Sequence, residues 1–543
     1  MNAGIFEKHY DVIIIGGGAT GAGTARDCAM RGLRTLMVER YDITTGATGR
    51  NHGLLHSGAR YAVTDQESAT ECIDENMILR YIAKPYVEEH DGLFITLPED
   101  DLAYQEKFVE SCWKAGINAK VIDPKEAIQM EPSVNPTLIG AVQVPDGSID
   151  PFRLTMANVL DAQLHGAQIL TYHEVTGFII ENGRMLGVHL RDNITGAKRE
   201  VRAEITINAA GIWGTLVAQM AGVNVSMFPA KGSLLIFGHR VNNMVINRCR
   251  KPANADILVP GDAITVIGTT SDRVPIESVD DMHVTPEEVE VLLSEGAKLA
   301  PALATTRILR AYAGVRPLVA SDNDPSGRSI SRGIVCLDHE TRDGLAGFIT
   351  ITGGKLMTYR MMAEVATDMA CLKLGVQQKC QTATTPLPGS DKSTVEEPEN
   401  HLYAFNARVG RHGTLAPSIA AMDDYQNSLV CECEEVSVGE VAHAIENMHV
   451  RTLTQLRRRV RLGMGTCQGE LCALRAAGIL CASCKKSIDE EKADLAEFLN
   501  ERWKGMYPVG WGPTLSEAQL TSVIYQDLCG ITSPSMKDRR QEP

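Results

Sequence analysis

The pattern of hydrophobic positions at the start of the chain predicts a strand, a tight turn, a helix and a second strand. Residues 11–15 read Asp-Val-Ile-Ile-Ile, a short β-branched run that is typical of a buried parallel strand. Four glycines lie within residues 16–21, and an Ala-rich stretch continues to residue 31. A second apolar run over residues 35–38 ends at an acidic residue. This order predicts the opening of a Rossmann-type α/β domain.

The glycines and the acidic residue have the spacing of a dinucleotide site. Gly16 permits the tight turn, Gly18 lets the backbone approach a pyrophosphate, and Gly21 lets the helix pack closely on the strand. Thr20 lies in the same loop, at a helix N-terminus that attracts phosphates. Glu39 lies 23 residues after Gly16, where a carboxylate can accept a hydrogen bond from a ribose hydroxyl. Both strands and the acid favour a dinucleotide site over an accidental glycine turn.

Later glycine turns favour FAD over NAD, because an extended FAD is held at several points. The loop over residues 44–53 is rich in Gly and Thr. Strands over residues 203–208 and 348–352 each lead into small residues or glycines. The further cofactor contacts expected from these turns are Thr45, Gly46, Gly211, Gly353 and Gly354.

The segments between these turns have a different pattern. Residues 76–149 and 233–339 contain stretches of alternating apolar and polar positions, which is typical of antiparallel sheet, and we expect them to form the walls of a substrate chamber. A Pro- and acid-rich stretch from Thr382 to Asn400 is expected to pack poorly and to separate the chain into two parts.

Composition restricts the class of protein further. Of 543 residues, 44% are hydrophobic and 22% charged, so a packed core is expected and global disorder is not. The net charge of −15 argues against broad binding to nucleic-acid phosphates. No apolar run approaches the roughly 18–20 residues that cross a bilayer, and residues 1–10 lack the regions of a signal peptide. We expect a cytoplasmic protein without a membrane span or a nucleic-acid partner.

The cysteines are concentrated near the C-terminus. Fourteen are too few for a disulfide scaffold, but six lie within 54 positions from Cys431. One Cys-x-Cys pair and one Cys-x4-Cys pair, 33 residues apart, suit zinc or an iron-sulfur cluster. This spacing is less typical of zinc ribbons, so an iron-sulfur cluster is favoured over zinc and over an empty domain. The expected ligands are Cys431, Cys433, Cys467 and Cys472, and Cys481 and Cys484 are expected to be spare thiols.

Several longer motifs are similar to those of one family. They are Ile14-Ile-Gly-Gly-Gly-Ala-Thr-Gly21, His56-Ser-Gly-Ala-Arg-Tyr61, Asn208-Ala-Ala-Gly211, Ala230-Lys-Gly232, Tyr312-Ala-Gly-Val-Arg-Pro-Leu318, Ser331-Arg332 and Gly353-Gly-Lys-Leu-Met-Thr-Tyr-Arg360. Through these motifs, residues 10–385 resemble the FAD-dependent glycerol-3-phosphate dehydrogenase family, within the flavin oxidoreductases of glycine-oxidase-like architecture. Residues 461–472 resemble the bacterioferritin-associated-ferredoxin-like [2Fe-2S] domain. With that extension, the whole chain resembles the catalytic subunits of the anaerobic, respiratory-chain-linked branch of the family.

The resemblance implies an α/β FAD-binding Rossmann-type domain with an interleaved α+β antiparallel-sheet substrate domain, followed by a small, mainly helical iron-sulfur domain. The expected boundaries are an oxidoreductase domain over 1–385 (FAD-binding parts 10–75, 150–232 and 340–385; substrate parts 76–149 and 233–339), a linker region over 386–427, a [2Fe-2S] domain over 428–484 and a C-terminal extension over 485–543.

The resemblance also implies an activity. The chain is expected to oxidise sn-glycerol 3-phosphate to dihydroxyacetone phosphate and to pass electrons through FAD and [2Fe-2S] to partner subunits and a quinone. The partners include a membrane-associated iron-sulfur subunit, which would place the chain peripherally at the inner membrane. The expected catalytic residues are His56, Arg316 and Lys355, and the expected substrate-binding residues are Arg60, Arg316, Arg332, Lys355 and Thr358.

Some features leave the chemistry open. The family often has His after Lys-Gly-Ser, where this chain has Leu234, so a base cannot be assigned there. The loop with His52 and His56 also resembles relatives that oxidise 2-hydroxy acids or amino acids, and either histidine can be structural instead of a base. The alternatives are therefore an FAD-dependent 2-hydroxy-acid or amino-acid dehydrogenase, or a non-catalytic redox sensor. The arginines of residues 457–461 suit an anionic cluster, an acidic partner, lipid headgroups or a solvated helix face.

Overall fold

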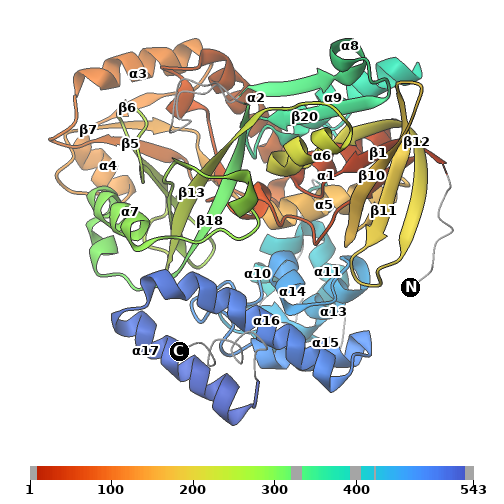
Figure 1. Cartoon of the computed structure of the whole chain (residues 1–543). Helices are drawn as coiled ribbons and strands as arrows, with labels where there is room; N and C mark the ends of the chain where they lie inside the picture. The colour runs from red at the N-terminus through yellow and green to blue at the C-terminus, as the bar shows by residue number, and fades with distance from the viewer. Residues whose placement is uncertain (1–8, 320–332, 392–394, 396–404, 421–423, 532–543) are drawn as a thin grey trace.

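The computed structural model describes residues 9–319, 333–391, 395, 405–420 and 424–531. Its first sheet has eight strands, with β10-β11-β12-β1-β2-β9 in order and β20 and β19 continuing beside β12 (Figure 1). The strands are β1 (His9–Ile15), β2 (Thr35–Val38), β9 (Gln168–Leu170), β10 (His173–Glu181), β11 (Arg184–Asp192), β12 (Lys198–Asn208), β19 (Ile334–Asp338) and β20 (Phe348–Gly353). Strands β9, β2, β1, β12 and β20 run parallel, which confirms the predicted Rossmann-type arrangement.

Helices that pack against this sheet include α1 (Ala19–Met30), α5 (Pro151–Leu164) and α9 (Tyr359–Leu374). The short apolar side chains of α1 allow close packing, and Val12, Ala22 and Met156 lie in one buried core. The same core includes Val441 and Leu456 from the C-terminal part of the chain. The cysteine-rich segment is therefore packed onto the Rossmann-type part.

The second sheet has nine strands and is mostly antiparallel, as the alternating pattern predicted. Its strands are β5 (Gly92–Thr96), β6 (Lys120–Ile122), β7 (Gly140–Val144), β13 (Met227–Phe237), β14 (Val245–Arg248), β15 (Ile257–Pro260), β16 (Thr265–Gly268), β17 (Asp272–Arg273) and β18 (Ile308–Val319). The helices of this part are α2 (Gln66–Ile82), α3 (Ala103–Lys114), α4 (Pro124–Met130) and α7 (Pro286–Leu299). A small sheet of β3 (Leu54–Leu55), β8 (Gly147–Ile149) and β4 (Val87–Glu88) lies between the parts.

The predicted boundaries of the substrate part differ from the structure at two points. Strand β13 belongs to the second sheet and begins at Met227, before the expected boundary at 233. Strand β19 was expected in the substrate part, but it pairs with β20 in the first sheet, with Ile334 opposite Gly353. An isolated apolar strand carries no sign of which sheet it joins, because its pairing partner is distant in sequence.

The C-terminal part is mainly helical. Its elements are α10 (Phe405–His412), α11 (Ala416–Ala420), α12 (Asp424–Asn427), the hairpin β21 (Leu429–Cys431) and β22 (Val436–Ser437), α13 (Val438–Asn447), α14 (Leu453–Val460), α15 (Ala473–Cys484), α16 (Ile488–Met506) and α17 (Gly512–Ser522). Helices α6 (Gly214–Met220) and α8 (His339–Asp343) precede it in the chain and contact the first sheet. Capping boxes open α13 and α14 at Ser437 and Thr452, so the chain sequence fixes both helix starts locally.

The predicted linker over 386–427 is wrong for its described residues. Leu387 is 1% exposed in a buried cluster, and Arg411 of α10 pairs with the buried Glu440 of α13 at 2.7 Å. The Pro-rich composition indicated poor packing, but prolines and polar residues are accommodated where partners from distant segments satisfy them. The described residues of this segment therefore pack against both parts of the chain.

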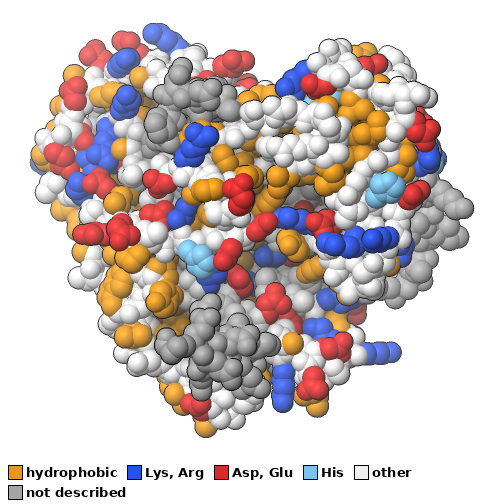
Figure 2. Space-filling view, in the orientation of Figure 1, with side chains coloured by type: hydrophobic (Ala, Val, Ile, Leu, Met, Phe, Trp, Pro, Cys, Tyr) orange, Lys and Arg blue, Asp and Glu red, His pale blue; other side chains and the backbone are white. Residues whose placement is uncertain are grey.

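The surface is mixed in charge. Acidic and basic side chains are interspersed over the face shown in Figure 2 instead of gathering in one basic patch. Within the described part of the chain, no helix combines the length and apolar character required to span a bilayer.

Candidate functional site

The turn after β1 forms a phosphate cradle at the start of α1. Gly16 has φ +117°, and a Cβ on it would lie 2.6 Å from the carbonyl oxygen of Ala209. A Cβ on Gly21 would lie 1.9 Å from the carbonyl oxygen of Gly16, so only glycine lets α1 approach the strand this closely. Gly18 caps α1 without a side-chain hydrogen bond. The backbone N–H groups of this end therefore suit an anionic pyrophosphate.

The end of β2 provides an acidic contact beside the cradle. Glu39 accepts hydrogen bonds from the backbone N–H of Gly17 at 2.7 Å and of Tyr41 at 2.9 Å. Burial raises the pKa of Glu39, while these hydrogen bonds oppose that shift. Arg40 follows and lies over the ring of Trp213, 4.7 Å from its centroid. This end of the site offers a carboxylate and a flat aromatic surface.

One cavity of about 480 Å³ joins the cradle to the substrate sheet. Its lining includes the predicted cofactor residues Gly16, Gly18, Thr20, Glu39, Thr45, Gly46, Gly211, Gly353 and Gly354, and the predicted substrate-end residues His56, Arg60, Arg316 and Lys355. Gly353 and Gly354 both have positive φ, and a Cβ on Gly354 would lie 2.4 Å from Met362 Sδ. The cavity thus fits a long dinucleotide that runs from Glu39 towards Lys355, as FAD would.

Arg316 and Lys355 lie at the substrate end. The Arg316 guanidinium donates to the Thr270 carbonyl oxygen and to Ser271 Oγ, both at 2.9 Å, which fixes its orientation. Lys355 Nζ lies 4.8 Å from the centroid of the Tyr61 ring, a distance at which a cation is attracted by the aromatic face. Two cations from distant segments therefore converge on this end.

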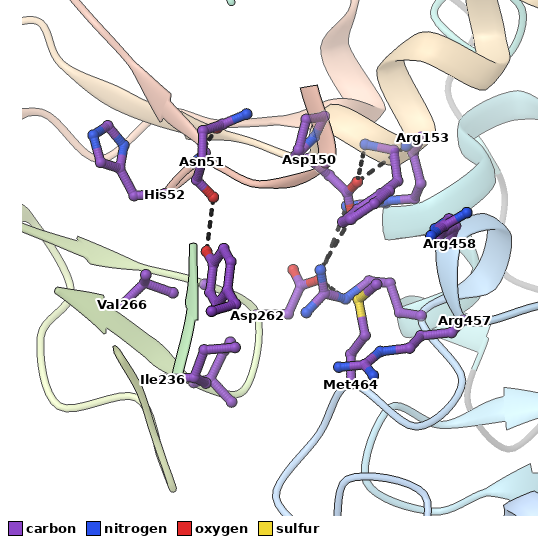
Figure 3. Close-up of a pocket in the computed structure, with 18 of the residues that line it drawn as sticks. Asn51, His52, Asp150, Arg153, Ile236, Asp262, Val266, Arg457, Arg458 and Met464 are labelled. Atoms are coloured by element: carbon purple, nitrogen blue, oxygen red, sulfur yellow. Dashed lines mark hydrogen bonds and ion pairs between the residues drawn. The ribbon is translucent and has the colours of Figure 1, made fainter. Parts of the chain in front are cut away.

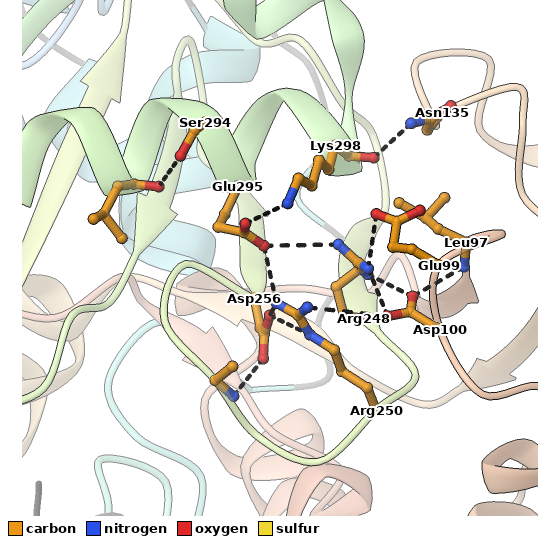
Figure 4. Close-up of polar contacts among 12 residues, drawn as sticks. Leu97, Glu99, Asp100, Asn135, Arg248, Arg250, Asp256, Ser294, Glu295 and Lys298 are labelled. Carbon is orange, nitrogen blue, oxygen red and sulfur yellow. Dashed lines mark hydrogen bonds and ion pairs between the residues drawn. The ribbon is translucent and has the colours of Figure 1, made fainter.

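Arg60 is already paired. Its Nη2 lies 3.2 Å from Asp256 Oδ2, and Asp256 is 1% exposed. Arg250 also contacts Asp256, at 2.7 Å, within the polar network that includes Arg248 and Glu295 (Figure 4). Although Arg60 lines the cavity, the carboxylate reduces the charge that it can offer to a substrate phosphate.

Two predicted substrate residues need a different account. Thr358 is fully buried and is not among the residues that line the cavity, so the structure does not bring it to the substrate end. Its Oγ1 accepts a hydrogen bond from the Lys355 backbone N–H at 2.9 Å, which closes the turn before α9. Arg332 lies outside the described residues.

The two loop histidines have different surroundings. His56 is 7% exposed, and its ring lies 5.5 Å from the Tyr61 ring. His52 accepts a hydrogen bond at Nδ1 from the Leu54 backbone N–H at 3.2 Å, which favours a neutral ring with its proton on Nε2. Since His52 already holds its own loop, His56 is the better placed of the two to act on substrate.

The four predicted cluster cysteines come together from three elements. Cys431 ends β21, Cys433 follows in the hairpin, and Cys472 directly precedes α15. The thiol of Cys431 contacts that of Cys472, and the thiol of Cys467 contacts those of Cys433 and Cys472. A Cβ on Gly465 would lie 2.5 Å from Cys433 Cβ, which explains a glycine in the motif before Cys467.

The thiol chemistry and spacing suit a two-iron cluster. The same thiol contacts lower the pKa of Cys431 and Cys467 and raise that of Cys433 and Cys472, so they establish that the four sulfurs are neighbours. Thiolates are the ligands that iron-sulfur clusters require. Four thiols in two closely spaced pairs can supply two ligands to each of two irons. Cys481 and Cys484 lie about two to three turns further along α15.

The two centres are close neighbours. A second cavity, of about 680 Å³, is lined by Cys433 and by Arg50, Asn51 and His52, and the last three also line the flavin cavity (Figure 3). The loop of residues 50–52 is therefore a shared wall. The expectation that a linker separates the two sites is wrong, because salt bridges and a common core hold the parts together.

The arginines of residues 457–461 form much of that connection. Arg459 and Arg458 contact the carboxylate of Asp42, after β2, at 2.5 and 2.9 Å. Arg461 contacts Asp262 at 2.6 Å and Glu434 at 2.8 Å. These side chains join domains, so they are neither a solvated face nor a surface for lipid headgroups.

Sequence reasoning missed several residues of the site. Thr48 accepts a hydrogen bond at Oγ1 from the Ala19 backbone N–H at 3.1 Å and so links the Gly- and Thr-rich loop to the cradle. Trp213 and Arg40 form the flat surface near Glu39. Thr48 lay in a loop whose composition indicated phosphate contacts, whereas nothing local marked Trp213, which depends on a contact between distant segments.

Comparison with known proteins agrees with both sites. Residues 11–360 match the family described as FAD dependent oxidoreductase, and residues 429–482 match the family described as BFD-like [2Fe-2S] binding domain. The fold and the sites define an FAD-dependent oxidoreductase that carries a [2Fe-2S] domain. The predicted cofactors and fold class are thereby confirmed.

Relatives that match nearly the whole chain identify the family within this class of oxidoreductases. The chain is 60% identical over 526 residues to the A subunit of the anaerobic glycerol-3-phosphate dehydrogenase of Escherichia coli (strain K12), covering 96% of this chain and 97% of that protein. It is 57% identical over 536 residues to the protein of the same name from Haemophilus influenzae, covering 98% and 95%. The chain belongs to the family of anaerobic glycerol-3-phosphate dehydrogenase A subunits, as the sequence motifs predicted.

A solved structure shares the fold over most of the chain. The glycerol-3-phosphate dehydrogenase from Bacillus halodurans, solved with FAD, superposes with a TM-score of 0.68 at 21% identity, covering 92% of this chain and 95% of that one. Glycine oxidase from Geobacillus kaustophilus superposes with a TM-score of 0.56 at 20% identity, covering 72% and 100%. These similarities confirm the predicted glycine-oxidase-like architecture.

Proposed function

We propose that this chain is the catalytic subunit of a glycerol-3-phosphate dehydrogenase that converts sn-glycerol 3-phosphate to dihydroxyacetone phosphate. The observation that carries the proposal is the single cavity in which a dinucleotide cradle meets Arg316, Lys355 and His56. The names of the 57–60% identical relatives supply the substrate. The chemistry supplied by bound FAD is acceptance of hydride from substrate C2, and that supplied by the cluster is one-electron transfer.

The cations of the cavity would bind and orient the substrate. Arg316 donates from Nε, Nη1 and Nη2 to neutral oxygens, so these contacts orient the guanidinium without cancelling its charge, which would attract a phosphate group. Lys355 lies beside the Gly353-Gly354 turn and supports negative charge at the flavin end. Arg60 adds a weaker contact because Asp256 shares its charge. Arg332 remains part of this proposal on motif resemblance alone.

A ring nitrogen of His56 would take the proton from the C2 hydroxyl. The neutral imidazole is the form that can accept a proton, and its ordinary pKa suits that role near neutral pH. His56 lines the same cavity as Arg316 and is largely shielded from solvent. The shielding would keep bulk water away from the reacting carbon.

An anaerobic reduction experiment tests the proposal. Purified holoprotein is mixed with sn-glycerol 3-phosphate, with a 2-hydroxy acid or with an amino acid, and its flavin absorbance is followed. We expect glycerol 3-phosphate to bleach the flavin absorbance and the other two compounds to leave it unchanged. Bleaching by lactate or proline in its place would support the alternative dehydrogenase, and bound flavin that none of them reduces would support a redox sensor.

We further propose that electrons leave through the cluster to partner subunits, including a membrane-associated iron-sulfur subunit, and then to a quinone. The relatives are named as A subunits, which implies other subunits in those enzymes. The chain would then be cytoplasmic and lie peripherally at the inner membrane through those partners. In flotation assays it should bind stripped membranes only with its partner subunits; tight binding of the isolated chain would contradict this.

A further inference from the structure

The cavity of about 680 Å³ between the two centres has walls from every part of the chain. Arg50 comes from the loop after β2, Ile236 and Arg310 come from strands of the substrate sheet, and Arg457 comes from α14. Figure 3 shows Ile236 and Val266 on the opposite side of this space from Arg457 and Arg458. The cavity is distinct from the flavin cavity and is larger, and none of the proposed steps of alcohol oxidation uses it.

Three arginines in this cavity lack full hydrogen-bonding partners among the described residues. Arg310 has its Nε and Nη1 buried without any hydrogen bond. Arg457 has only a long contact of 3.4 Å from Nη2 to Gln468 Oε1. The guanidinium of Arg50 makes no hydrogen bond or ion pair with the part of the chain that the structure describes. The two Arg310 nitrogens are buried, whereas Arg50 and Arg457 are half-buried side chains that line the same cavity. A guanidinium has five N–H donors, so three of them with so few protein acceptors around one cavity suit an anionic ligand.

Neighbouring arginines that line the same cavity do have ion-pair partners. Arg461 forms ion pairs with Asp150, Asp262 and Glu434, and Arg153 pairs with Asp150 at 2.9 Å. Poor packing of the cavity therefore does not explain why some of its arginines have few hydrogen-bond partners. The deficit is confined to Arg50, Arg310 and Arg457.

The charge balance of the three arginines is positive. Burial lowers the pKa of Arg50, Arg310 and Arg457, and Glu501 opposes the shift at all three. Asp280 and Asp281 also oppose it at Arg50, but they form ion pairs with Arg40 and Lys504. Arginine stays protonated in proteins, so Glu501 is the carboxylate that these three positive charges share. An anion would relieve the cost of keeping these charges out of water.

The apolar residues of the cavity favour an organic ligand over an inorganic ion. Ile236, Val266 and Phe498 line the cavity together with Tyr312, whose hydroxyl donates to the Asn51 carbonyl oxygen at 2.8 Å. The volume lies within the range of about 300–1,000 Å³ that is usual for sites of small organic ligands. Arg310 is the register partner of Ile236 in the β13–β18 pairing, so apolar surface and guanidiniums lie next to one another, which suits an organic body that carries a phosphate.

We propose that this cavity binds an organic phosphate of about nucleotide size, with its phosphate on Arg50, Arg310 and Arg457. The ligand would lie against the wall of residues 50–52, between the flavin cavity and Cys433. It would hold the substrate sheet, the nucleotide-binding part and the cluster domain to one another, since each contributes one arginine. The proposal does not depend on which alcohol the flavin oxidises.

The test is calorimetric titration of anaerobically purified, dialysed holoprotein with full FAD and cluster content, using ADP and inorganic phosphate as probes. Bound FAD blocks the flavin cavity, so any ADP site lies elsewhere. We expect ADP to bind more tightly than phosphate, and Arg310→Gln and Arg457→Gln each to weaken ADP binding about 10- to 100-fold. Arg475→Gln is the matched control, because Arg475 lies near the cluster cysteines but pairs with Glu432 outside the cavity.

A second measurement keeps the proposal open to refutation if a variant folds poorly. Acid extracts of undialysed wild-type holoprotein are analysed for organic phosphate beyond that of FAD, and a stoichiometric amount would support the site. No extra phosphate together with no ADP binding would overturn it. If ADP binds no more tightly than inorganic phosphate, the proposal that the ligand is organic is wrong. If Arg310→Gln and Arg457→Gln shift the cluster potential in redox titration without changing ADP binding, the arginines serve the cluster and the proposal is wrong.

Discussion

Replacing Asp42 by Asn should loosen the contact between the flavin part and the cluster domain. Asp42 is 2% exposed and accepts from Arg459 at 2.5 Å and from Arg458 at 2.9 Å. Burial alone would raise the pKa of Asp42, but the two guanidiniums outweigh it and lower the pKa. The carboxylate is therefore ionised and compensates two positive charges at the domain contact.

The expected magnitude follows from that burial. Asn keeps the size of the side chain but removes the charge, and Arg459, whose side chain is 1% exposed, is left without a counter-charge. Removing one partner of a buried ion pair costs about 3–5 kcal/mol. That is a factor of roughly 10² to 5 × 10³ in the equilibrium between docked and undocked domains.

The assay follows the two parts separately. Denaturant unfolding of the holoprotein is monitored by cluster absorbance and by flavin fluorescence, and stopped-flow mixing with glycerol 3-phosphate monitors flavin and then cluster reduction. Asp42→Asn should unfold the cluster part at lower denaturant and slow cluster reduction while leaving flavin reduction unchanged. Glu204→Gln is the control, because its pair with Arg184 is about half exposed on both sides and should contribute at most about 1 kcal/mol. If the two variants lose the same stability and transfer electrons at the wild-type rate, this ion pair does not hold the domains together.

Four other changes test separate features. Arg316→Ala should lower kcat/KM for glycerol 3-phosphate about 10- to 100-fold with unchanged flavin content, because one charge-assisted contact is lost; an unaltered kcat/KM in steady-state assays would remove Arg316 from the phosphate site. Gly21→Ala should abolish FAD retention, since its Cβ would lie 1.9 Å from a backbone oxygen, and full flavin absorbance per chain would contradict the packing. Cys467→Ser should lose cluster iron and its paramagnetic signal while Cys481→Ser keeps both, and the reverse result in iron analysis would reassign the ligands. Burial first, and then the imidazole of His412, lower the pKa of His443 to about 4. Between pH 6.5 and 4 the unfolded state therefore binds more protons than the folded state, and the free energy of unfolding should fall as the pH drops through this range. In urea titrations at several pH values, His443→Gln should flatten this dependence.

Local sequence determined the elements that build the flavin cradle. The β-branched run before Gly16, the glycines at Gly18 and Gly21, and Glu39 are all within one short segment, so their spacing alone specifies a strand, a turn and a helix start. The same holds for Cys431 and its neighbours, because ligand type and spacing are visible in the chain. These parts could be predicted since each depends on contacts between residues near one another in sequence.

Residue roles within the cavity were only partly predictable. Arg316 and Lys355 were expected at the substrate end and both line it, whereas Thr358 is buried beneath the turn. A motif gives residues in order but not the direction in which each side chain points. The partial neutralisation of Arg60 by Asp256 involves residues 196 positions apart, so no local pattern shows it.

The relation between the two redox sites was decided by tertiary structure alone. Composition predicted a linker, but Asp42 binds Arg459 across 417 positions, and a common core joins the two parts. Ion pairs and packing between distant segments depend on how whole faces meet, which composition does not record. The arginines around Arg457 illustrate the difference: as sequence they are one basic run, whereas the fold gives Arg458, Arg459 and Arg461 carboxylate partners and leaves Arg457 facing a cavity.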